Sequence, residues 1–176
     1  MPDVTGMAGN RLHFLTANDW VLIQARTTKQ VFKLGDEIIK QGEMSKGLCI
    51  IRRGEASVEL AGSGSRSILA LLGPDDVCGE IAFLEQGAAT ASVIASEEEV
   101  EVDKIEAREL KGMLEVFPGL ASRFYLSLAV ILAHRLRVTS KELAREMELR
   151  DRRDAPSRAS KEIDFGLTAL PPKAAQ

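Results

Sequence analysis

The stretch GEIAFLEQGAATASV, from Gly79 to Val93, lies in the middle of the chain and interrupts a series of short apolar segments. It opens with a glycine and a glutamate before a short apolar turn, a pattern that lets a backbone come close to a phosphate. The stretch contains no arginine or lysine that would neutralise a phosphate. It is therefore either a working phosphate-binding turn or one that keeps only the shape.

Short strands lie on both sides of this stretch. From Thr28 to about Lys104, glycines recur at short intervals and separate segments rich in valine, isoleucine and leucine, such as QVFKL, LCIIRR and TASVIAS. Regularly punctuated short strands indicate an all-β sandwich or barrel. Apolar and polar residues alternate in EASVELAG and EVEVDKI, which predicts one face in the core and one in water. The residues expected to face the core are Ala56, Val58 and Leu60 in the first segment and Val100, Val102 and Ile105 in the second.

Helical patterns precede and follow the strands. Residues Leu15 to Arg26 predict a helix capped near Thr16 or Asn18, because both side chains can accept a hydrogen bond from the first turn. Residues Glu106 to Val116 predict a short helix, which Phe117-Pro118-Gly119 ends because proline disfavours helical geometry in the residue before it. The core-facing residues of the first helix are expected to be Trp20, Leu22 and Ile23.

A second and much longer helix is predicted from about Leu120 to Arg150. Its apolar residues recur at spacings of three and four and form a stripe roughly 45 Å long. The second half, VTSKELAREMELR, would extend past a domain of this size, so a partner helix from a second subunit is the expected cover. The alternative is a solvated helix with a frayed end. The stripe consists of Leu120, Phe124, Leu128, Ile131 or Leu132, Leu136, Leu143 and Met147.

The length of 176 residues allows one domain with appendages. We expect a flexible N-terminus over residues 1–14, a domain over residues 15–140 whose long helix continues to about residue 150, and a disordered tail over residues 151–176. Within the tail only IDFGLTAL, Ile163 to Leu170, stands out. It is either a docking segment or lid, or, as the default, a chance group of apolar residues in an unstructured tail.

The charge balance argues against nucleic acid as the main partner. The chain has 23 Lys and Arg against 26 Asp and Glu, a net charge of -3, without the basic excess that nonspecific DNA binding requires. The N-terminus lacks the pattern of a signal peptide, and the longest apolar run, LSLAVILA at 126–133, is too short to span a membrane. We therefore expect a soluble, cytoplasmic protein.

Neither cysteine nor histidine suggests a catalytic or metal site. Cys49 and Cys78 each lie in an apolar context without a metal-ligand spacing, so buried reduced thiols are expected. His13 and His134 lie outside the predicted strands, so they cannot supply the clustered ligands that a metal-dependent β-barrel enzyme would need. No nucleophile, base or carboxylate pair is arranged for catalysis, and we expect a protein that is not an enzyme.

Taken together, the strands, the GE-initiated turn and the two final helices resemble the cyclic nucleotide-binding domain family, over about residues 15–140. The resemblance implies an antiparallel β-roll of the double-stranded jelly-roll type, mainly β with flanking helices. It lies in VFKLGDEIIKQGE at 31–43, LCIIRRGEASVE at 48–59, LALLGPDDVCGEIAFL at 69–84 and ATASVIA at 89–95. Two departures concern packing and turn geometry: Cys78 stands where the family often has phenylalanine, and Asp75 where it often has glycine.

The resemblance implies a phosphate-binding cassette, in which the first backbone amides of a short helix receive the cyclic phosphate of cAMP or cGMP. Gly79, Ile81 and Ala82 match the amide positions, and Glu80 matches the glutamate that accepts a hydrogen bond from the ribose 2′-hydroxyl. A side chain at Gly79 would obstruct the ligand's approach to the backbone. Gly79 and Glu80 could also be retained only as a turn and an N-terminal charge that start the helix.

The sequence departs from the family at the phosphate-pairing arginine. Ala89 stands at that position, followed by Thr90 and Ala91. Loss of a charge-assisted contact of roughly 3 kcal/mol weakens binding about a hundredfold. Thr90 could donate a hydroxyl hydrogen bond to the phosphate, and the neighbouring hairpin offers three arginines that could reach it. These are Arg52, Arg53 and Arg66.

Two functions fit this sequence. One is a stand-alone sensor or adaptor, in which a nucleotide moves the break at Phe117-Pro118-Gly119, the long helix passes the change to a partner, and Phe124 or Leu128 covers the base. The other is a protein-interaction or dimerisation module that kept the fold and lost the ligand, using the helices and the 163–170 segment; Ala89 favours it. A transcription factor would need a helix-turn-helix after the long helix, and the polar, proline-bearing residues 151–176 do not supply one, so no direct DNA binding is expected.

Overall fold

The computed structural model describes residues 11–44, 46–62 and 64–154. The chain divides into one unit over Met1–Val138 and a second over Thr139–Gln176. The first unit contains every strand and three complete helices among these residues, and the described part of the second is the C-terminal part of the last helix. In order, the elements are α1 (Ala17–Gln24), β1 (Thr28–Phe32), β2 (Glu37–Ile39), β3 (Gly47–Arg53), β4 (Ala56–Ala61), β5 (Arg66–Leu72), β6 (Val77–Cys78), α2 (Glu80–Glu85), β7 (Ser92–Ala95), β8 (Val100–Glu106), α3 (Ala107–Val116) and α4 (Pro118–Asp154).

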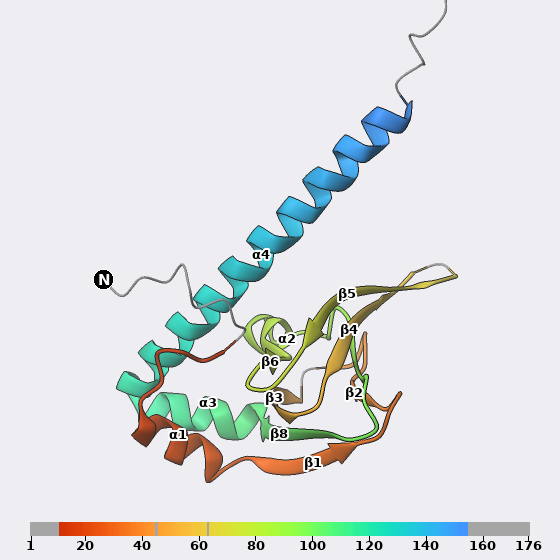
Figure 1. The fold of residues 1–176 in the computed structure, drawn as a ribbon. Helices are drawn as coiled ribbons and strands as arrows, with labels where there is room; N and C mark the ends of the chain where they lie inside the picture. The colour runs from red at the N-terminus through yellow and green to blue at the C-terminus, as the bar shows by residue number, and fades with distance from the viewer. Residues whose placement is uncertain (1–10, 45, 63, 155–176) are drawn as a thin grey trace, which may run out of the picture. The chain divides into compact units, whose positions relative to one another are not determined.

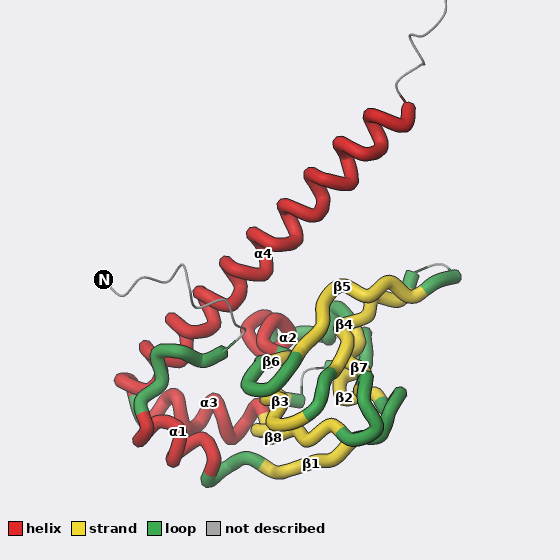
Figure 2. Tube along the Cα trace, viewed as in Figure 1, coloured by secondary structure: helices red, strands yellow, loops and turns green. Residues whose placement is uncertain are grey.

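The eight strands form two antiparallel sheets, which confirms the predicted fold class. One sheet has the order β1-β8-β3-β6 and the other β2-β7-β4-β5, and the two make the roll drawn in Figure 1. Helices α1 and α3 and the N-terminal part of α4 lie together beside the first sheet (Figure 2). This is the predicted mainly β architecture with flanking helices.

Strand β3 is covered on both faces. Leu48 and Ile50 pack in a cluster with the helices, whereas Cys49 and Ile51 pack in a second cluster between the sheets. Because side chains alternate across a strand, each cluster takes every second residue. The run of apolar residues in β3 thus reflects two cores, one above and one below the sheet.

Of the residues predicted to face the core, Ile105 is buried on the opposite face of its strand and Leu60 is partly exposed. Ile105 was expected beside Val100 and Val102, but it packs with the helices, because an odd step along a strand reverses the face. Leu60 is 39% exposed, since it lies near the end of β4, in the hairpin that reaches beyond the rest of the roll (Figure 1).

Helix α1 is held at its start by the predicted cap. The Thr16 hydroxyl accepts a hydrogen bond from the Asp19 amide, and the Asp19 carboxylate accepts one from the Thr16 amide at 2.7 Å. Asp19 is buried, and Arg123 of α4 donates two hydrogen bonds of 2.7 Å to its carboxylate. Hydrogen bonding by Arg123 holds the pKa of Asp19 well below its usual range, despite burial, which acts in the opposite direction. This charged pair ties the first helix to the last.

Helix α4 is longer at both ends than predicted. It begins at Pro118, since proline is tolerated in the first turn, where its missing N–H leaves no bond unmade. It continues to Asp154, so residues 151–154, expected in the tail, are helical. Residues 1–10 and 155–176, including the segment 163–170, lie outside the described residues, and the predictions made for them stay predictions.

The predicted stripe of α4 is buried only in part. Leu120, Phe124, Leu128 and Ile131 are at most 2% exposed. Leu136 is 70% exposed, contrary to the expectation of a continuous buried stripe in the domain. Farther along, Leu143 and Met147 are 57% and 59% exposed in the single chain.

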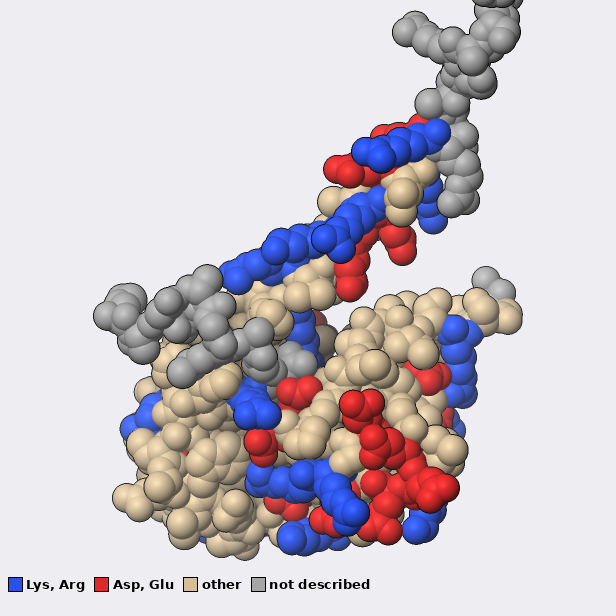
Figure 3. Space-filling view, in the orientation of Figure 1, with Lys and Arg blue, Asp and Glu red and all other residues tan. Residues whose placement is uncertain are grey.

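Charged side chains of both signs are interspersed on the face of the molecule shown in Figure 3. This mixture is what the balanced composition predicts, whereas a nucleic acid surface concentrates positive charge. Among the residues described, no helix is long and apolar enough to cross a membrane.

The buried pair of Asp19 and Arg123 predicts a pH-dependent stability. Asp19→Asn keeps a cap acceptor but removes the charge, so we expect Tm to fall by a few degrees at pH 7. Because the folded-state pKa is depressed, the contribution of Asp19 is complete above the unfolded-state pKa of about 4 and is lost as pH falls through the lower folded-state value. Thermal unfolding of both proteins between pH 7 and pH 3 measures this. A Tm difference that stays constant down to pH 3 contradicts the assignment.

Candidate functional site

The cassette helix α2 starts at a glycine in a left-handed conformation. Gly79 precedes the helix with φ 86°, and its carbonyl accepts a hydrogen bond from the Phe83 amide at 3.0 Å. The helix ends six residues later, where Gln86 has φ 53°. The sequence GEIAFLE therefore forms the short helix that the resemblance implied.

Glycine is required at position 79 by the chain itself. A Cβ atom there would lie 2.8 Å from the carbonyl oxygen of Gly47, and the positive φ strains any other residue. A Cβ on Gly47 would lie 1.9 Å from the carbonyl oxygen of Ile105. Main-chain atoms of β8, β3 and the cassette turn are therefore in close contact. This contact requires glycine at position 79, in addition to the expected approach of a ligand.

All seven residues that the resemblance assigned to ligand binding line one cavity of about 70 Å³. Ile39, Val58, Cys78 and Val93 add strand residues to the wall, and Arg135 adds a cation from α4. The structure thus brings together residues from two stretches of sequence on either side of Gln86. The seven are Gly79, Glu80, Ile81, Ala82, Ala89, Thr90 and Ala91.

The carboxylate of Glu80 is buried and held by Arg135. Glu80 is 2% exposed, and one guanidinium nitrogen of Arg135, Nη1, donates a hydrogen bond to Glu80 Oε1. The other, Nη2, donates to the carbonyl of Val77 at 2.6 Å.

The cavity lined by the cassette residues measures about 70 Å³. Since sites for small molecules enclose about 300 Å³ or more, this cavity must enlarge to admit a nucleotide.

Sequence reasoning missed Arg135. The buried residues Phe124, Leu128 and Ile131 are spaced by four and three, and four more residues lead to position 135. A charged residue at the next position of a buried stripe is directed at the core and needs a buried partner. That signal was present, but Leu136 was read as the continuation of the stripe.

The three hairpin arginines do not lie at the cassette. Arg52 donates to Asp103 at 2.6 Å, and its guanidinium lies 5.4 Å from the ring centre of Trp20. Arg53 lies near Glu99 and Glu101, and Arg66 near Glu37 and Glu59. None of the three lines the cavity, so the structure does not bring the expected substitutes for the missing arginine to it.

The two residues expected to cover the base are in the core instead. Phe124 and Leu128 are each 1% exposed and pack with the helix-side cluster. The ring of Phe124 meets that of Phe83 edge to face, with centres 6.2 Å apart. Neither residue lines the cavity. Phe124 packs α4 against the cassette helix, and neither residue faces this cavity.

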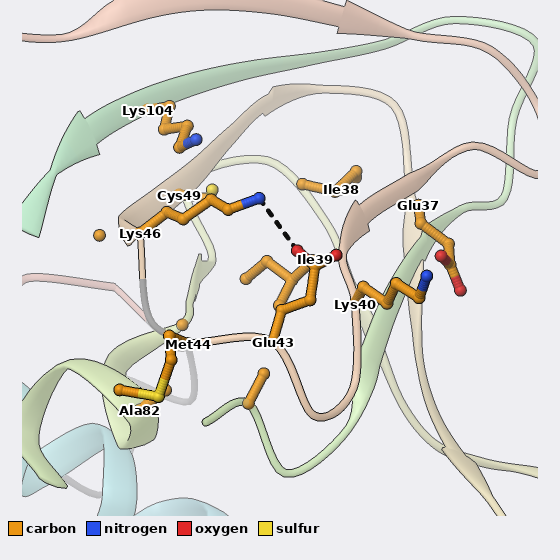
Figure 4. A pocket seen from close by; sticks show the side chains of 13 residues that line it. Glu37, Ile38, Ile39, Lys40, Glu43, Met44, Lys46, Cys49, Ala82 and Lys104 are labelled. Atoms are coloured by element: carbon orange, nitrogen blue, oxygen red, sulfur yellow. Dashed lines mark hydrogen bonds and ion pairs between the residues drawn. The ribbon is translucent and has the colours of Figure 1, made fainter. Parts of the chain in front are cut away.

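A second cavity, of about 210 Å³, adjoins the first. It shares Ile39, Gly79, Ala82 and Ala89 with it and is otherwise lined from β2, β3, β8 and the β2–β3 loop. Figure 4 shows this cavity with Lys46 and Glu43, which form an ion pair of 2.9 Å. Lys40 and Lys104 also line it.

The two cysteines lie opposite one another. Cys49 on β3 pairs in register with Cys78 on β6, and both are buried, free thiols, as the sequence predicted. The hydrogen bond to Cys49 and burial raise the pKa of the Cys78 thiol. Among the described residues no group of three or more His, Cys, Asp or Glu side chains could hold a metal ion.

The Glu80–Arg135 pair predicts a coupled loss of stability. Arg135→Met leaves a buried carboxylate without its partner, so we expect the free energy of unfolding to fall by about 3 kcal/mol. Glu80→Gln in the same chain should recover part of this loss, because the uncompensated charge is removed. Urea unfolding of the two single variants and the double variant measures the coupling. Arg137→Met, at an exposed position of the same helix, is the control with little expected change; equal losses at 135 and 137 contradict the buried pair.

Comparison with known proteins agrees with the fold. The family described as Cyclic nucleotide-binding domain matches residues 29–116, half of the chain. Cyclic GMP-binding protein C of Dictyostelium discoideum is 35% identical over 129 residues, 67% of this chain and 5% of that protein. The crystal structure of Thermus thermophilus Catabolite Activator Protein has a TM-score of 0.65 and 26% identity, and covers 77% of this chain and 62% of that one.

A cyclic nucleotide-binding domain from Methylobacillus flagellatus KT shares the fold, with a TM-score of 0.69 at 16% identity over 78% of this chain and 82% of that one. The present chain spans less than two thirds of the Dictyostelium and Thermus proteins. The matched residues run from the second residue of β1 to the end of α3 and include the whole cassette. With its roll, its GE-initiated cassette helix and its closing helices, the chain belongs to the cyclic nucleotide-binding domain family.

Proposed function

We propose that this chain is a regulatory domain that binds a cyclic nucleotide, cAMP or cGMP, at the cassette and catalyses no reaction. The observation that carries the proposal is the buried carboxylate of Glu80 at the start of α2, in the wall of a cavity with the other six cassette residues. A carboxylate there can accept a hydrogen bond from a ribose 2′-hydroxyl, while the nearby amides face the phosphate. Because Ala89 lacks a charge, we infer binding weaker than, or different from, the family pattern.

Binding would be coupled to α4 through Arg135. The Arg135 guanidinium donates hydrogen bonds to Glu80 Oε1 and to the Val77 carbonyl. A ribose that approaches Glu80 must therefore share the carboxylate with Arg135 or displace the guanidinium. A displaced Arg135 would loosen a contact between α4 and the roll. Together with the break between α3 and α4 at Phe117, this offers a route from ligand to helix.

A ligand-free interaction module is the second candidate. Three observations favour it: Ala89 has no charge for a phosphate, the cavity measures about 70 Å³, and Arg135 already satisfies Glu80. In this case the cassette helps to hold α4, and the partner is another protein.

Both candidates are compatible with a homodimer through α4. Leu143 and Met147, four residues apart on one helix, are more than half exposed in the single chain. Exposed apolar side chains on a helix at this spacing are the usual seam of a helix pair. We infer that a second copy covers Leu143 and Met147.

Strand β5, at the edge of its sheet, also exposes two apolar side chains, Ile68 by 65% and Leu71 by 62%.

Titration calorimetry with cAMP and cGMP tests the binding function. We expect micromolar or weaker binding, and at least a tenfold loss in Glu80→Gln, since a charge-assisted hydrogen bond contributes about 1.5 to 3 kcal/mol. Glu85→Gln, at the other end of α2, is the matched control and should bind like the parent. No heat at millimolar nucleotide contradicts the binding proposal and favours the ligand-free module.

Ala89→Arg tests the position of the phosphate in the same assay. Restoring the family arginine should tighten binding of a cyclic nucleotide by about a hundredfold. An unchanged affinity would mean that the phosphate does not lie beside residue 89.

Light scattering tests the homodimer. We expect the full chain to have about twice the mass of 19.2 kDa, and Leu143→Glu with Met147→Glu to have the mass of a monomer, because two charges cannot be buried in the seam. Glu142→Gln with Glu146→Gln, on neighbouring positions of the same helix, should leave the mass unchanged. A monomeric parent chain at micromolar concentration rules the dimer out.

A further inference from the structure

The loop between β2 and β3 lies between the two halves of the cassette. On one side, the Gly42 amide donates to the Ala89 carbonyl, and the Ala89 amide donates to the Glu43 carbonyl, both at 2.8 Å. On the other side, the carbonyl of Gly47 is the atom nearest to where a Cβ would lie on Gly79. Glu43 thus contacts the neighbourhood of position 89, and Lys46 precedes the residue that contacts Gly79.

The ion pair of this loop faces the cavity that adjoins the cassette. The Lys46 ammonium lies 2.9 Å from Glu43 Oε2, and both residues line the 210 Å³ cavity with Gly79, Ala82 and Ala89 (Figure 4). The Lys46 side chain is 66% exposed, so water competes for the pair and little holds it in place. Lys46 can therefore exchange Glu43 for another anion at small cost.

The wall between the two cavities is made of small residues. Of the four residues that line both, Gly79, Ala82 and Ala89 carry at most a methyl group. An arginine at position 89 would extend from this wall into one of the cavities. With alanine there, the wall leaves room for a charge that comes from the opposite side.

We propose that Lys46 provides the cation for the phosphate of the bound cyclic nucleotide, in place of the arginine missing at position 89, and that Glu43 holds this ammonium when the site has no ligand. The inference rests on the proposed function. On binding, the phosphodiester anion replaces the Glu43 carboxylate as the partner of Lys46. Glu43 is then a competitor of the ligand and lowers its affinity.

Other described cations are less well placed for this role. Arg135 is bound to Glu80 and Val77 in the first cavity. The Lys104 side chain, on strand β8, is 18% exposed and pairs with Glu106, so water competes less for its ion pair than for that of Lys46. In Figure 4 Lys40 lies at the end of the cavity near Glu37, away from Ala82. Lys46 lies at the end of the loop next to Gly47, whose carbonyl oxygen is the atom nearest to a Cβ placed on Gly79.

Calorimetry with cAMP and cGMP on the full chain tests the proposal. Two substitutions are expected to change the affinity in opposite directions. Lys46→Met should weaken binding about tenfold, because a charge-assisted contact is lost. Glu43→Gln should tighten it severalfold, because the competing carboxylate is gone. An ion pair that only shaped the loop would give changes of the same sign in both variants. Lys33→Met, which removes an exposed lysine that lies 3.8 Å from Glu99, is the charge-matched control.

The outcomes separate this inference from the proposed function. If the parent chain binds and Glu80→Gln weakens binding, but Lys46→Met and Glu43→Gln leave it unchanged, only the role of Lys46 is wrong. If the parent chain binds neither nucleotide, both proposals fail. Ala89→Arg added to Lys46→Met should restore the lost affinity. A parallel titration with inorganic phosphate tests whether the anion is a cyclic nucleotide or free phosphate. If phosphate alone binds, and this binding depends on Lys46, the site is one for free phosphate and the proposal is wrong.

Discussion

The burial of one carboxylate governs the relation between the cassette and the final helix. Glu80 is 2% exposed, and an ionised carboxylate in such a place needs a cation and hydrogen-bond donors. Arg135 supplies both from α4, while it also donates to Val77 at the start of β6. The same helix packs Phe124 against Phe83 of the cassette helix and binds Asp19 of α1 through Arg123. One long helix therefore fixes three parts of the first unit, and the cassette is one of them.

Much of the fold could be predicted because its signals are local. The glycine spacing, the alternation in β4 and β8, the cap at Thr16 and the break at Pro118 each depend on a few adjacent residues. Asp75 stands where the family often has glycine, and its φ of 69° lies in the left-handed region that glycine adopts easily. Aspartate tolerates this region better than most residues. The errors at Leu60, Ile105 and Leu136 have a different origin. Which face of a strand or helix is buried, and which strand end is covered, depends on elements that are distant in sequence.

The candidate site could be predicted in its backbone but not in its charges. A resemblance in sequence found the seven cassette residues, and the structure gathers them around one cavity. The arginines of the neighbouring hairpin that were expected to reach the phosphate, Arg52, Arg53 and Arg66, pair with carboxylates elsewhere. Two of the cations that line the cavities, Arg135 and Lys46, come from α4 and from the β2–β3 loop, and only the three-dimensional pairing of distant segments brings them there.

The contact between Gly79 and Gly47 has a consequence for how such domains diverge. Main-chain atoms of β8, β3 and the cassette turn determine one another's positions without any ligand-binding side chain. Mutation at position 89 can therefore remove a ligand contact while the turn keeps its form, and selection for folding alone is enough to preserve Gly79. In a lineage that has lost its nucleotide, the glycine would outlast the arginine. The presence of Gly79 alone is therefore weak evidence for a ligand, and the charged residues around it are better evidence for what such a domain binds.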